Sequence, residues 1–177
     1  MPIRDRRWVI EHVGILTADE VARIRDLGCV VTTHTNRYVF KEGAAFRSRL
    51  GPGAEDTITP LRRLRDAGVN VALGTDNVPT SLFHPVWQAV ARRARITNEV
   101  IAPAQRLARE ESLRAATLGG AYLTFEEDLK GTIAVGKLAD LVALSDDPLT
   151  CGESSIRDIT ADLTIVGGRI AHERLQA

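Results

Sequence analysis

Residues 8–34, WVIEHVGILTADEVARIRDLGCVVTTH, predict a strand, a helix and a second strand in close succession. The short stretch at 8–12, which begins with Trp, Val and Ile, and the β-branched run at 29–33 are both typical of strands. Between them, Thr17 and Glu20 have the spacing of a capping box, in which each side chain satisfies a free backbone amide at a helix start. Connections this short are typical of an α/β unit, so this stretch indicates the fold class.

The predicted helix carries one apolar face, which consists of Leu16, Val21, Ile24 and Leu27. Gly28 follows this face and is expected to end the helix in the left-handed conformation. The cycle then repeats. Residues 34–56, which hold several glycines, are expected to form a long connection, and Thr59 and Pro60 to begin a second helix as N-cap and first residue. Residues 69–74 are expected to form a third strand, because such apolar runs are typical of parallel strands buried on both faces.

The middle of the chain is predicted to be helical, at 84–95, 103–107 and 111–123. After residue 130 the pattern changes to short strands, at 131–133, 141–144, 163–166 and 169–171, with Gly167 and Gly168 as the turn of a hairpin between the last two. The predicted helix at 84–95 holds one basic cluster, which we interpret as a solvated face; it consists of Arg92, Arg93 and Arg95. We divide the chain into a domain at 1–125 and a smaller C-terminal unit at 126–177.

Composition limits the classes of function. Of the 177 residues 44% are hydrophobic, enough for a core, and 23 basic residues balance 23 acidic ones. This balance, without a long basic run, argues against nucleic acid as a partner. No apolar run approaches the ~20 residues of a membrane span, and the two cysteines do not have the spacing of a disulfide framework or a zinc knuckle. We expect a cytoplasmic protein with no membrane partner.

Three polar side chains follow the three predicted strands: His12, His34 and Asp76. In a (β/α) barrel, groups at the carboxyl ends of strands face the active site, and imidazole and carboxylate are suitable ligands for zinc or a similar divalent ion. Asp76 has a second use, because a carboxylate accepts a proton from an attacking water. Each residue also has a simpler interpretation, since a lone histidine is commonly a hydrogen-bonded core residue and an Asp-Asn pair commonly a turn. His84 is interpreted as structural and His172 as exposed.

Four segments, in this order, carry a resemblance to a known protein family: VIEH at 9–12, GTDN at 74–77, GTIAVGKLADLV at 131–142 and DLTIVGGRI at 162–170. Together they resemble the amidohydrolase superfamily, and in particular its amidohydrolase-3 branch, which includes N-substituted formamide deformylases. The third segment is quite specific to these enzymes. The first two are short, and their order and spacing give them weight.

The resemblance implies an α/β fold: the C-terminal part of a (β/α)8 TIM-like barrel with strands six to eight, followed by helices and part of a small β-sandwich. It also implies a divalent metal cofactor, zinc first among the candidates. His12 is then the strand-six metal ligand. Asp76 is both the strand-eight ligand and the catalytic carboxylate that orients the water and moves its proton. Thr33, His34 and Asn77 are implied to contact the substrate.

The same resemblance implies a metal-dependent hydrolase of non-peptide C–N bonds, with a small amide, formamide or cyclic amide as substrate. Strands one to five of such a barrel have no counterpart here, and a complete barrel takes ~250 residues. We therefore expect a truncated chain that is inactive alone for want of an N-terminal portion, and that forms homo-oligomers or needs a partner. The alternative is a non-catalytic remnant, or a subunit completed by another chain. A nucleotide-binding module is disfavoured, because no glycine-rich turn follows a strand.

Overall fold

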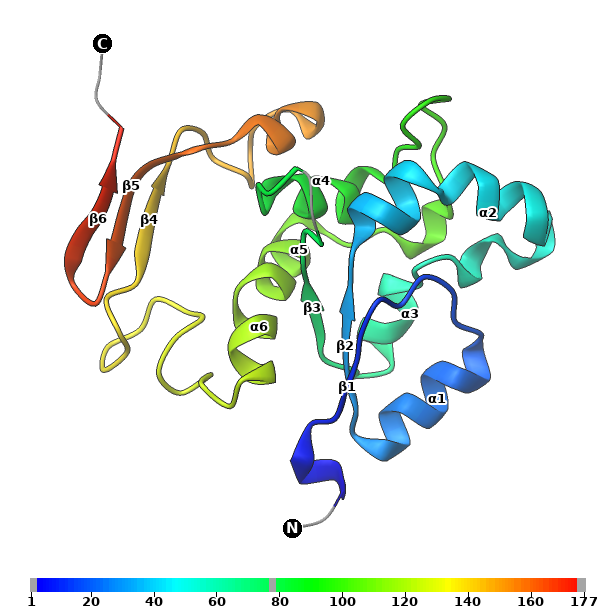
Figure 1. Ribbon diagram of the computed structural model, residues 1–177, viewed down its shortest axis with the longest axis horizontal. Coiled ribbons are helices and arrows are strands. Elements are labelled where there is room, and N and C mark those ends of the chain that lie inside the picture. The colour runs from blue at the N-terminus through cyan, green and yellow to red at the C-terminus, as the bar shows by residue number, and fades with distance from the viewer. Residues whose placement is uncertain (1–2, 77–78, 175–177) are drawn as a thin grey trace.

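The computed structural model describes residues 3–76 and 79–174 and contains two three-stranded sheets (Figure 1). The first sheet consists of parallel strands in the order β1 (Val9–Ile10), β2 (Val30–Thr33) and β3 (Val71–Leu73). Val31 of the central strand stands opposite Ile10 on one side and Val71 on the other. The three predicted parallel strands are confirmed, and their carboxyl ends meet at one edge of the sheet.

The helix between β1 and β2 forms as its flanking residues predict. α1 (Ala18–Leu27) begins at the predicted capping box and ends at Gly28, which has φ 67°. Val21 and Ile24 are buried, as expected for the inward face. Leu27 is wrongly predicted to lie on that face: it is 49% exposed, because it is the last residue of the helix and no further turn covers it.

The segment at 34–56 is helical, so the prediction of a long connection is wrong. It consists of a π-helix, η2 (Asn36–Lys41), then α2 (Gly43–Leu50) and a 3-10 helix, η3 (Pro52–Thr57). Gly43 has a packing role, because a Cβ at this position would lie 3.1 Å from the Ile101 side chain. Gly43 therefore marks a close approach to Ile101 and not a loop. The sequence around Gly43 does not show this, because Ile101 lies far away in the chain.

The second helix of the parallel unit, α3 (Leu61–Asp66), begins one residue later than predicted. Pro60 is the N-cap, and Thr59 has φ 41° and makes no side-chain cap. The amide of Thr59 donates to the carbonyl of Gly14 at 2.8 Å and fixes Thr59 against the turn after β1. This long-range hydrogen bond outweighs the local capping preference and sets the helix start.

Arg92 is fully buried, so its interpretation as part of a solvated face is wrong. The predicted helix at this point, α4 (Phe83–Ala91), ends just before it. The Arg92 guanidinium donates to three backbone carbonyls, those of Ile101 at 2.6 Å, Ile58 at 2.7 Å and Thr59 at 3.2 Å. Burial lowers the pKa of Arg92 to about 9, and the three carbonyls offset the cost of burying its charge. Arg92 therefore ties α4 to two loops.

The predicted helix at 111–123 is two helices, α5 (Arg109–Ala116) and α6 (Leu118–Leu123). The helix expected at 103–107 is a short 3-10 turn, η4 (Pro103–Gln105). α6 lies against β3 so closely that a Cβ at Gly119 would be 2.3 Å from the carbonyl oxygen of Val71. Glycine at this position is therefore a requirement of helix-to-strand packing.

The second sheet is antiparallel, in the order β4 (Leu141–Leu144), β5 (Ala161–Val166) and β6 (Arg169–Glu173). Gly167 and Gly168 join β5 to β6 with φ 56° and 79°, so the predicted hairpin is confirmed. The strand predicted at 131–133 does not form. This segment is a loop in which Ile133 is 89% exposed, because no strand among the described residues pairs with it.

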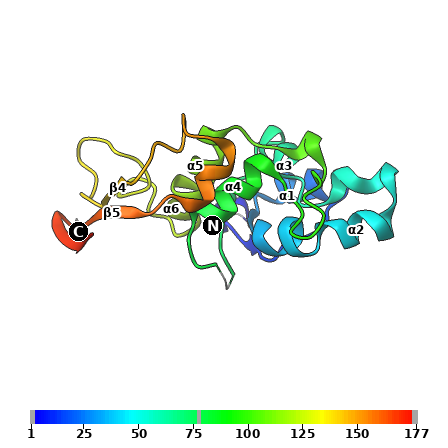
Figure 2. The same ribbon diagram turned by 90° about the horizontal axis from the view of Figure 1, so that it is seen from above.

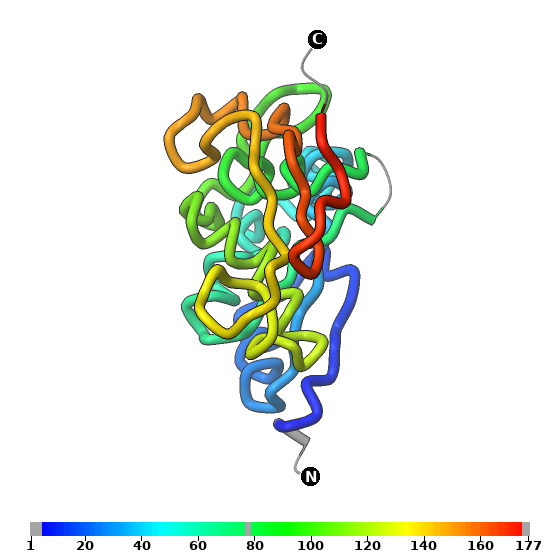
Figure 3. The backbone as a smooth tube through the Cα atoms, turned by 90° about the vertical axis from the view of Figure 1, so that its left-hand side faces the viewer, coloured from blue at the N-terminus to red at the C-terminus, as the bar shows by residue number. Residues whose placement is uncertain are grey.

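The two sheets lie apart, with α5 and α6 between them in Figure 1. Figure 2 shows β4 and β5 at one end of the long axis and α2 at the other, and Figure 3 looks onto the end formed by β4, β5 and β6. Two 3-10 turns complete the chain, η1 (Ile3–Arg6) and η5 (Glu153–Asp158). The main core gathers residues of the parallel unit, α4 and η5, among them Val31, Leu61, Leu64, Val86, Trp87 and Ile156. No helix in the described ranges is both long and apolar enough to cross a membrane.

Candidate metal centre

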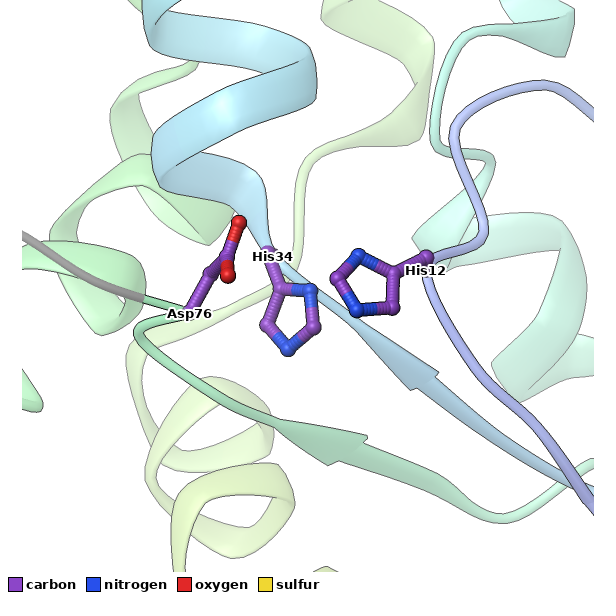
Figure 4. Close-up of side chains that lie close together, drawn as sticks. All are labelled: His12, His34 and Asp76. Carbon is purple, nitrogen blue, oxygen red and sulfur yellow. The ribbon is translucent and has the colours of Figure 1, made fainter.

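Three polar side chains meet at the carboxyl end of the parallel sheet (Figure 4). His12 follows β1, His34 follows β2 and Asp76 follows β3. One possible ligand atom from each, a ring nitrogen or a carboxylate oxygen, lies within 4.8 Å of the other two. Residues far apart in the sequence converge here because neighbouring parallel strands end at the same edge of a sheet.

The two outer members of this group have left-handed backbone. His12 has φ 57° and Asp76 has φ 65°. Histidine and aspartate enter this region more often than most residues, but it still costs free energy, and such residues concentrate at functional sites. The turn before Asp76 is anchored by the amide of Gly74, which donates to Thr33 O at 3.1 Å. The side chains of His12 and Asp76 lie on either side of His34 (Figure 4).

His34, the central member, is partly buried, and its Nδ1 is buried with no hydrogen-bond partner among the described residues. Its ring centroid lies 4.4 Å from that of His12. Burial first, and then the charge of His12, lower the pKa of His34, while Asp76 acts in the opposite direction. The other edge of the ring packs on Gly74, where a Cβ would lie 3.0 Å from Nε2. A neutral ring nitrogen with a free lone pair is what a metal ion requires of a histidine ligand.

His12 is exposed, and its Nδ1 lies 3.3 Å from the hydroxyl of Tyr38. Tyr38 belongs to η2, the π-helix that begins just after His34. The sequence assigns it no role, because it falls in the segment predicted to be a connection. No local pattern identifies Tyr38, since the contact joins the turn after β1 to an element that follows β2.

Asn36 and His84 form a second contact, beside the turn that carries Asp76. Asn36 is buried, and its Nδ2 lies 3.5 Å from both Thr75 O and Pro79 O, which precede and follow Asp76 in the chain. His84 is also buried and donates from Nδ1 to Asn36 Oδ1 at 2.5 Å. His84 is therefore a hydrogen-bonded core histidine, as the sequence predicts, and Asn36 links it to this turn.

The residues implied to contact a substrate have three different positions. Thr33 is fully buried, and its hydroxyl donates to Val13 O at 2.7 Å, so it supports the turn after β1. His34 lies in the three-residue group with His12 and Asp76. Asn77 lies outside the described residues.

Two imidazoles and one carboxylate form a donor set that suits zinc and similar divalent ions. Three protein ligands also leave one position of a tetrahedral zinc ion open, which is the arrangement of catalytic zinc sites. The free Nδ1 of His34 and the short distances between the ligand atoms fit such an ion. The group as a whole therefore has the chemistry of a candidate metal centre.

Two known proteins are similar to this chain over most of its length. It is 30% identical over 169 residues to an N-substituted formamide deformylase of Arthrobacter pascens, a match that covers 93% of this chain and 31% of that protein. It is 27% identical over 191 residues to a 5-methylthioadenosine/S-adenosylhomocysteine deaminase of Caldanaerobacter subterraneus subsp. tengcongensis, which covers 96% of this chain and 44% of that protein. The chain thus spans less than half the length of either relative.

The fold is also similar to that of solved structures. An adenosine deaminase from Xanthomonas campestris with bound zinc matches with a TM-score of 0.66 and 25% identity, over 95% of this chain and 37% of that one. The α/β fold class is therefore confirmed. The model of the amidohydrolase family matches residues 1–172, nearly the whole sequence. On this evidence the chain belongs to the amidohydrolase family.

Proposed function

We propose that His12, His34 and Asp76 bind a divalent metal ion, zinc in the first place, in a hydrolase of non-peptide C–N bonds. The observation that carries this proposal is the approach of three ligand atoms to within 4.8 Å at the end of the parallel sheet. The unpartnered Nδ1 of His34 supports it, because a buried nitrogen without a partner costs free energy that a metal ion recovers. His34 is then a metal ligand and not the substrate contact implied by the resemblance.

The proposal includes the place of this chain in a larger fold. The parallel order β1-β2-β3 supports its assignment to strands six to eight of a (β/α)8 barrel. The antiparallel order β4-β5-β6 supports the assignment of residues 126–177 to part of a β-sandwich, with residues 1–125 as the partial barrel. The zinc bound to the Xanthomonas campestris adenosine deaminase supports the choice of metal.

Each side chain has a defined part in the chemistry. When bound, a divalent ion polarises a carbonyl oxygen and makes water more acidic. His12 and His34 hold it as neutral imidazoles, and burial favours the neutral form of His34 because it lowers the pKa of this residue. Asp76 accepts the proton of the attacking water on a carboxylate oxygen and passes it to the leaving nitrogen. The substrate is a small amide, formamide or cyclic amide, and the name of the N-substituted formamide deformylase supports the formamide among these.

We also propose that this chain needs a further polypeptide to reach turnover. His12 and Asp76 are exposed, so the described residues do not enclose the site. An open site leaves the substrate free to change orientation, and water weakens the electrostatic stabilisation of the transition state. The same exposure supports the second candidate, a non-catalytic remnant or a subunit completed by another chain. Under either candidate we propose the same three ligands, His12, His34 and Asp76.

Calorimetric titration of the purified chain with zinc, manganese and cobalt tests the site. We expect one ion per chain, and a loss of affinity of roughly 10-fold or more in His12→Ala, His34→Ala and Asp76→Asn. Asparagine accepts left-handed backbone readily, so Asp76→Asn removes the charge with little effect on the turn. His172→Ala is the matched control, because His172 is exposed on β6. A wild-type chain that binds no ion, or variants that bind as tightly as the wild type, contradict the site.

Turnover is a separate measurement, made with simple formamides and cyclic amides and the same metals. We expect none from the chain alone, and turnover when a polypeptide with the remaining barrel strands is added. Turnover by the chain alone that is lost in Asp76→Asn would show that it builds a complete site. Metal binding with no turnover under either condition favours the non-catalytic candidate.

A further inference from the structure

We propose that Tyr38 is a positioning residue for His12: its hydroxyl accepts a hydrogen bond from Nδ1 of His12 and so reserves Nε2 as the metal-binding atom. This inference rests on the proposed metal site and adds to it a residue outside the three ligands. It begins from the 3.3 Å contact between the Tyr38 hydroxyl and His12 Nδ1.

Tyr38 contacts both histidines of the site. Its hydroxyl reaches the ring of His12, and its backbone amide donates to the carbonyl of His34 at 3.1 Å. One residue therefore links the end of β1 to the end of β2. π-helical segments such as η2 are frequent at functional sites, because the wide turn directs a side chain that a regular helix would direct elsewhere.

The ring of Tyr38 is held in place for this contact. It is 9% exposed. Its edge lies against the backbone of Gly14, where a Cβ would be 2.9 Å from the ring carbon Cδ1. The ring of Phe46 stacks on it with centroids 6.4 Å apart and an angle of 26°. Because Gly14 leaves room for the ring and Phe46 packs on it, the hydroxyl keeps its position beside His12.

The hydrogen bond selects one of two forms of His12. A neutral imidazole has one N–H donor and one bare nitrogen. When the phenol oxygen of Tyr38 accepts from Nδ1–H, the bare nitrogen is Nε2, and its lone pair is free for a metal ion. Histidine ligands commonly donate their second ring nitrogen in this way, and the partner fixes both the tautomer and the ring orientation. Removal of the Tyr38 hydroxyl should abolish this tautomer preference of His12 and leave the fold intact.

Long-range ¹H–¹⁵N NMR of the histidine side chains reads the tautomer with no metal present. At about pH 9, where an unperturbed histidine is neutral, we expect the proton of wild-type His12 on Nδ1. In Tyr38→Phe, which keeps the ring against Gly14 and removes only the hydroxyl, we expect it to shift to Nε2. The zinc Kd of this variant should rise roughly 10- to 100-fold.

The matched control is Tyr122→Phe, which removes the hydroxyl of the second of the chain's 2 tyrosines, on α6 beside Arg7. It should leave the tautomer of His12 and the zinc Kd unchanged. A proton on Nε2 in the wild type overturns the inference, as does a Tyr38→Phe variant with unchanged tautomer and Kd. If Tyr38→Phe does not fold, the wild-type spectrum alone decides. Zinc binding that is lost in His12→Ala but kept in Tyr38→Phe rejects only the positioning role, whereas binding kept in His12→Ala rejects the metal site as well.

Discussion

The 4 histidines of this chain lie in different environments, and the differences separate candidate ligands from structural residues. His84 is buried and paired with Asn36, and His172 is exposed on β6. His12 and His34 contact each other, ring to ring, and both have a nitrogen near a carboxylate oxygen. Two imidazoles beside a carboxylate can share a divalent ion, whereas among the described residues neither His84 nor His172 belongs to such a group.

His84 should make the fold sensitive to acid. Burial first, and then the charges of Arg157 and Lys41, lower the pKa of His84 to about 4, whereas a histidine in the unfolded chain titrates near 6.5. Between these values the unfolded state binds more protons, so the stabilisation is complete above pH 6.5 and is lost as the pH falls toward 4. The pKa difference corresponds to about 3 kcal/mol of unfolding free energy. Urea unfolding of the wild type at pH 7 and at pH 4 measures the loss.

Carboxylates also titrate in this range, so the contribution of His84 is isolated by a variant. His84→Asn keeps an amide donor near the position of Nδ1 and does not titrate, and it should reduce the stability lost between pH 7 and pH 4. His172→Asn is the control at an exposed histidine and should lose as much stability as the wild type. Equal losses in His84→Asn and the wild type contradict the assignment.

Among the elements, η2 (Asn36–Lys41) has the most influence on the candidate site. It begins after His34, presents Tyr38 to His12, and presents Asn36 to the turn that carries Asp76. One short segment therefore contacts all three parts of the proposed metal centre. Its own hydrogen bonds are local, but its contacts reach the ends of β1 and β3, so the site depends on how this element packs.

The packing of α6 on β3 predicts opposite effects for two neighbouring glycines. A Cβ at Gly119 would lie 2.3 Å from Val71 O, so Gly119→Ala must displace the helix from the strand. We expect it to lower the unfolding free energy by about 1–3 kcal/mol or more. At Gly120 a Cβ has no neighbour within 4 Å, and Gly120→Ala should raise the unfolding free energy by up to ~1 kcal/mol, because alanine favours helix. Chemical denaturation of both variants measures the difference, and similar effects at the two positions would contradict the close approach.

For the molecule as a whole, the surfaces most prone to association with other chains are the outer strands of the sheets and the exposed apolar residues near them. β1 and β3 are the outer strands of the parallel sheet. Trp8 is 56% exposed, and Val9 and Ile10 beside it are also exposed. Apolar residues at the edge of a sheet promote pairing with other chains. A second exposed apolar segment surrounds Ile133 in the loop before β4.

We therefore expect the purified chain to self-associate, and the mass measured by light scattering after size exclusion to rise with concentration. Ile10→Lys places a charge on the β1 edge and should shift the chain toward monomer. Ile133→Lys places the same charge on the loop before β4, so comparison of the two variants identifies the surface responsible. A monomer at every concentration, with a sharp melting transition, would contradict this expectation.

Local sequence determines much of this fold. The capping residues and Gly28 set both ends of α1, and the apolar runs set the three parallel strands, because each signal acts within a few residues of chain. Gly167 and Gly168 likewise set the turn of the terminal hairpin, since they accept positive φ. The order of His12, His34 and Asp76 after successive strands also follows from the sequence, and parallel pairing then requires the three to meet at one edge.

The tertiary structure decides what depends on distant partners. Arg92 is buried because the carbonyls of Ile58 and Ile101 receive its guanidinium, and no pattern around Arg92 contains that information. Tyr38 reaches His12 because a π-helix replaces the predicted connection and directs its ring across two strand ends. The sequence therefore determines which side chains stand at the ends of the strands. Three-dimensional packing determines which of them have free nitrogen atoms and which residues hold them in place, because hydrogen bonding and burial depend on neighbours that lie far away in the chain.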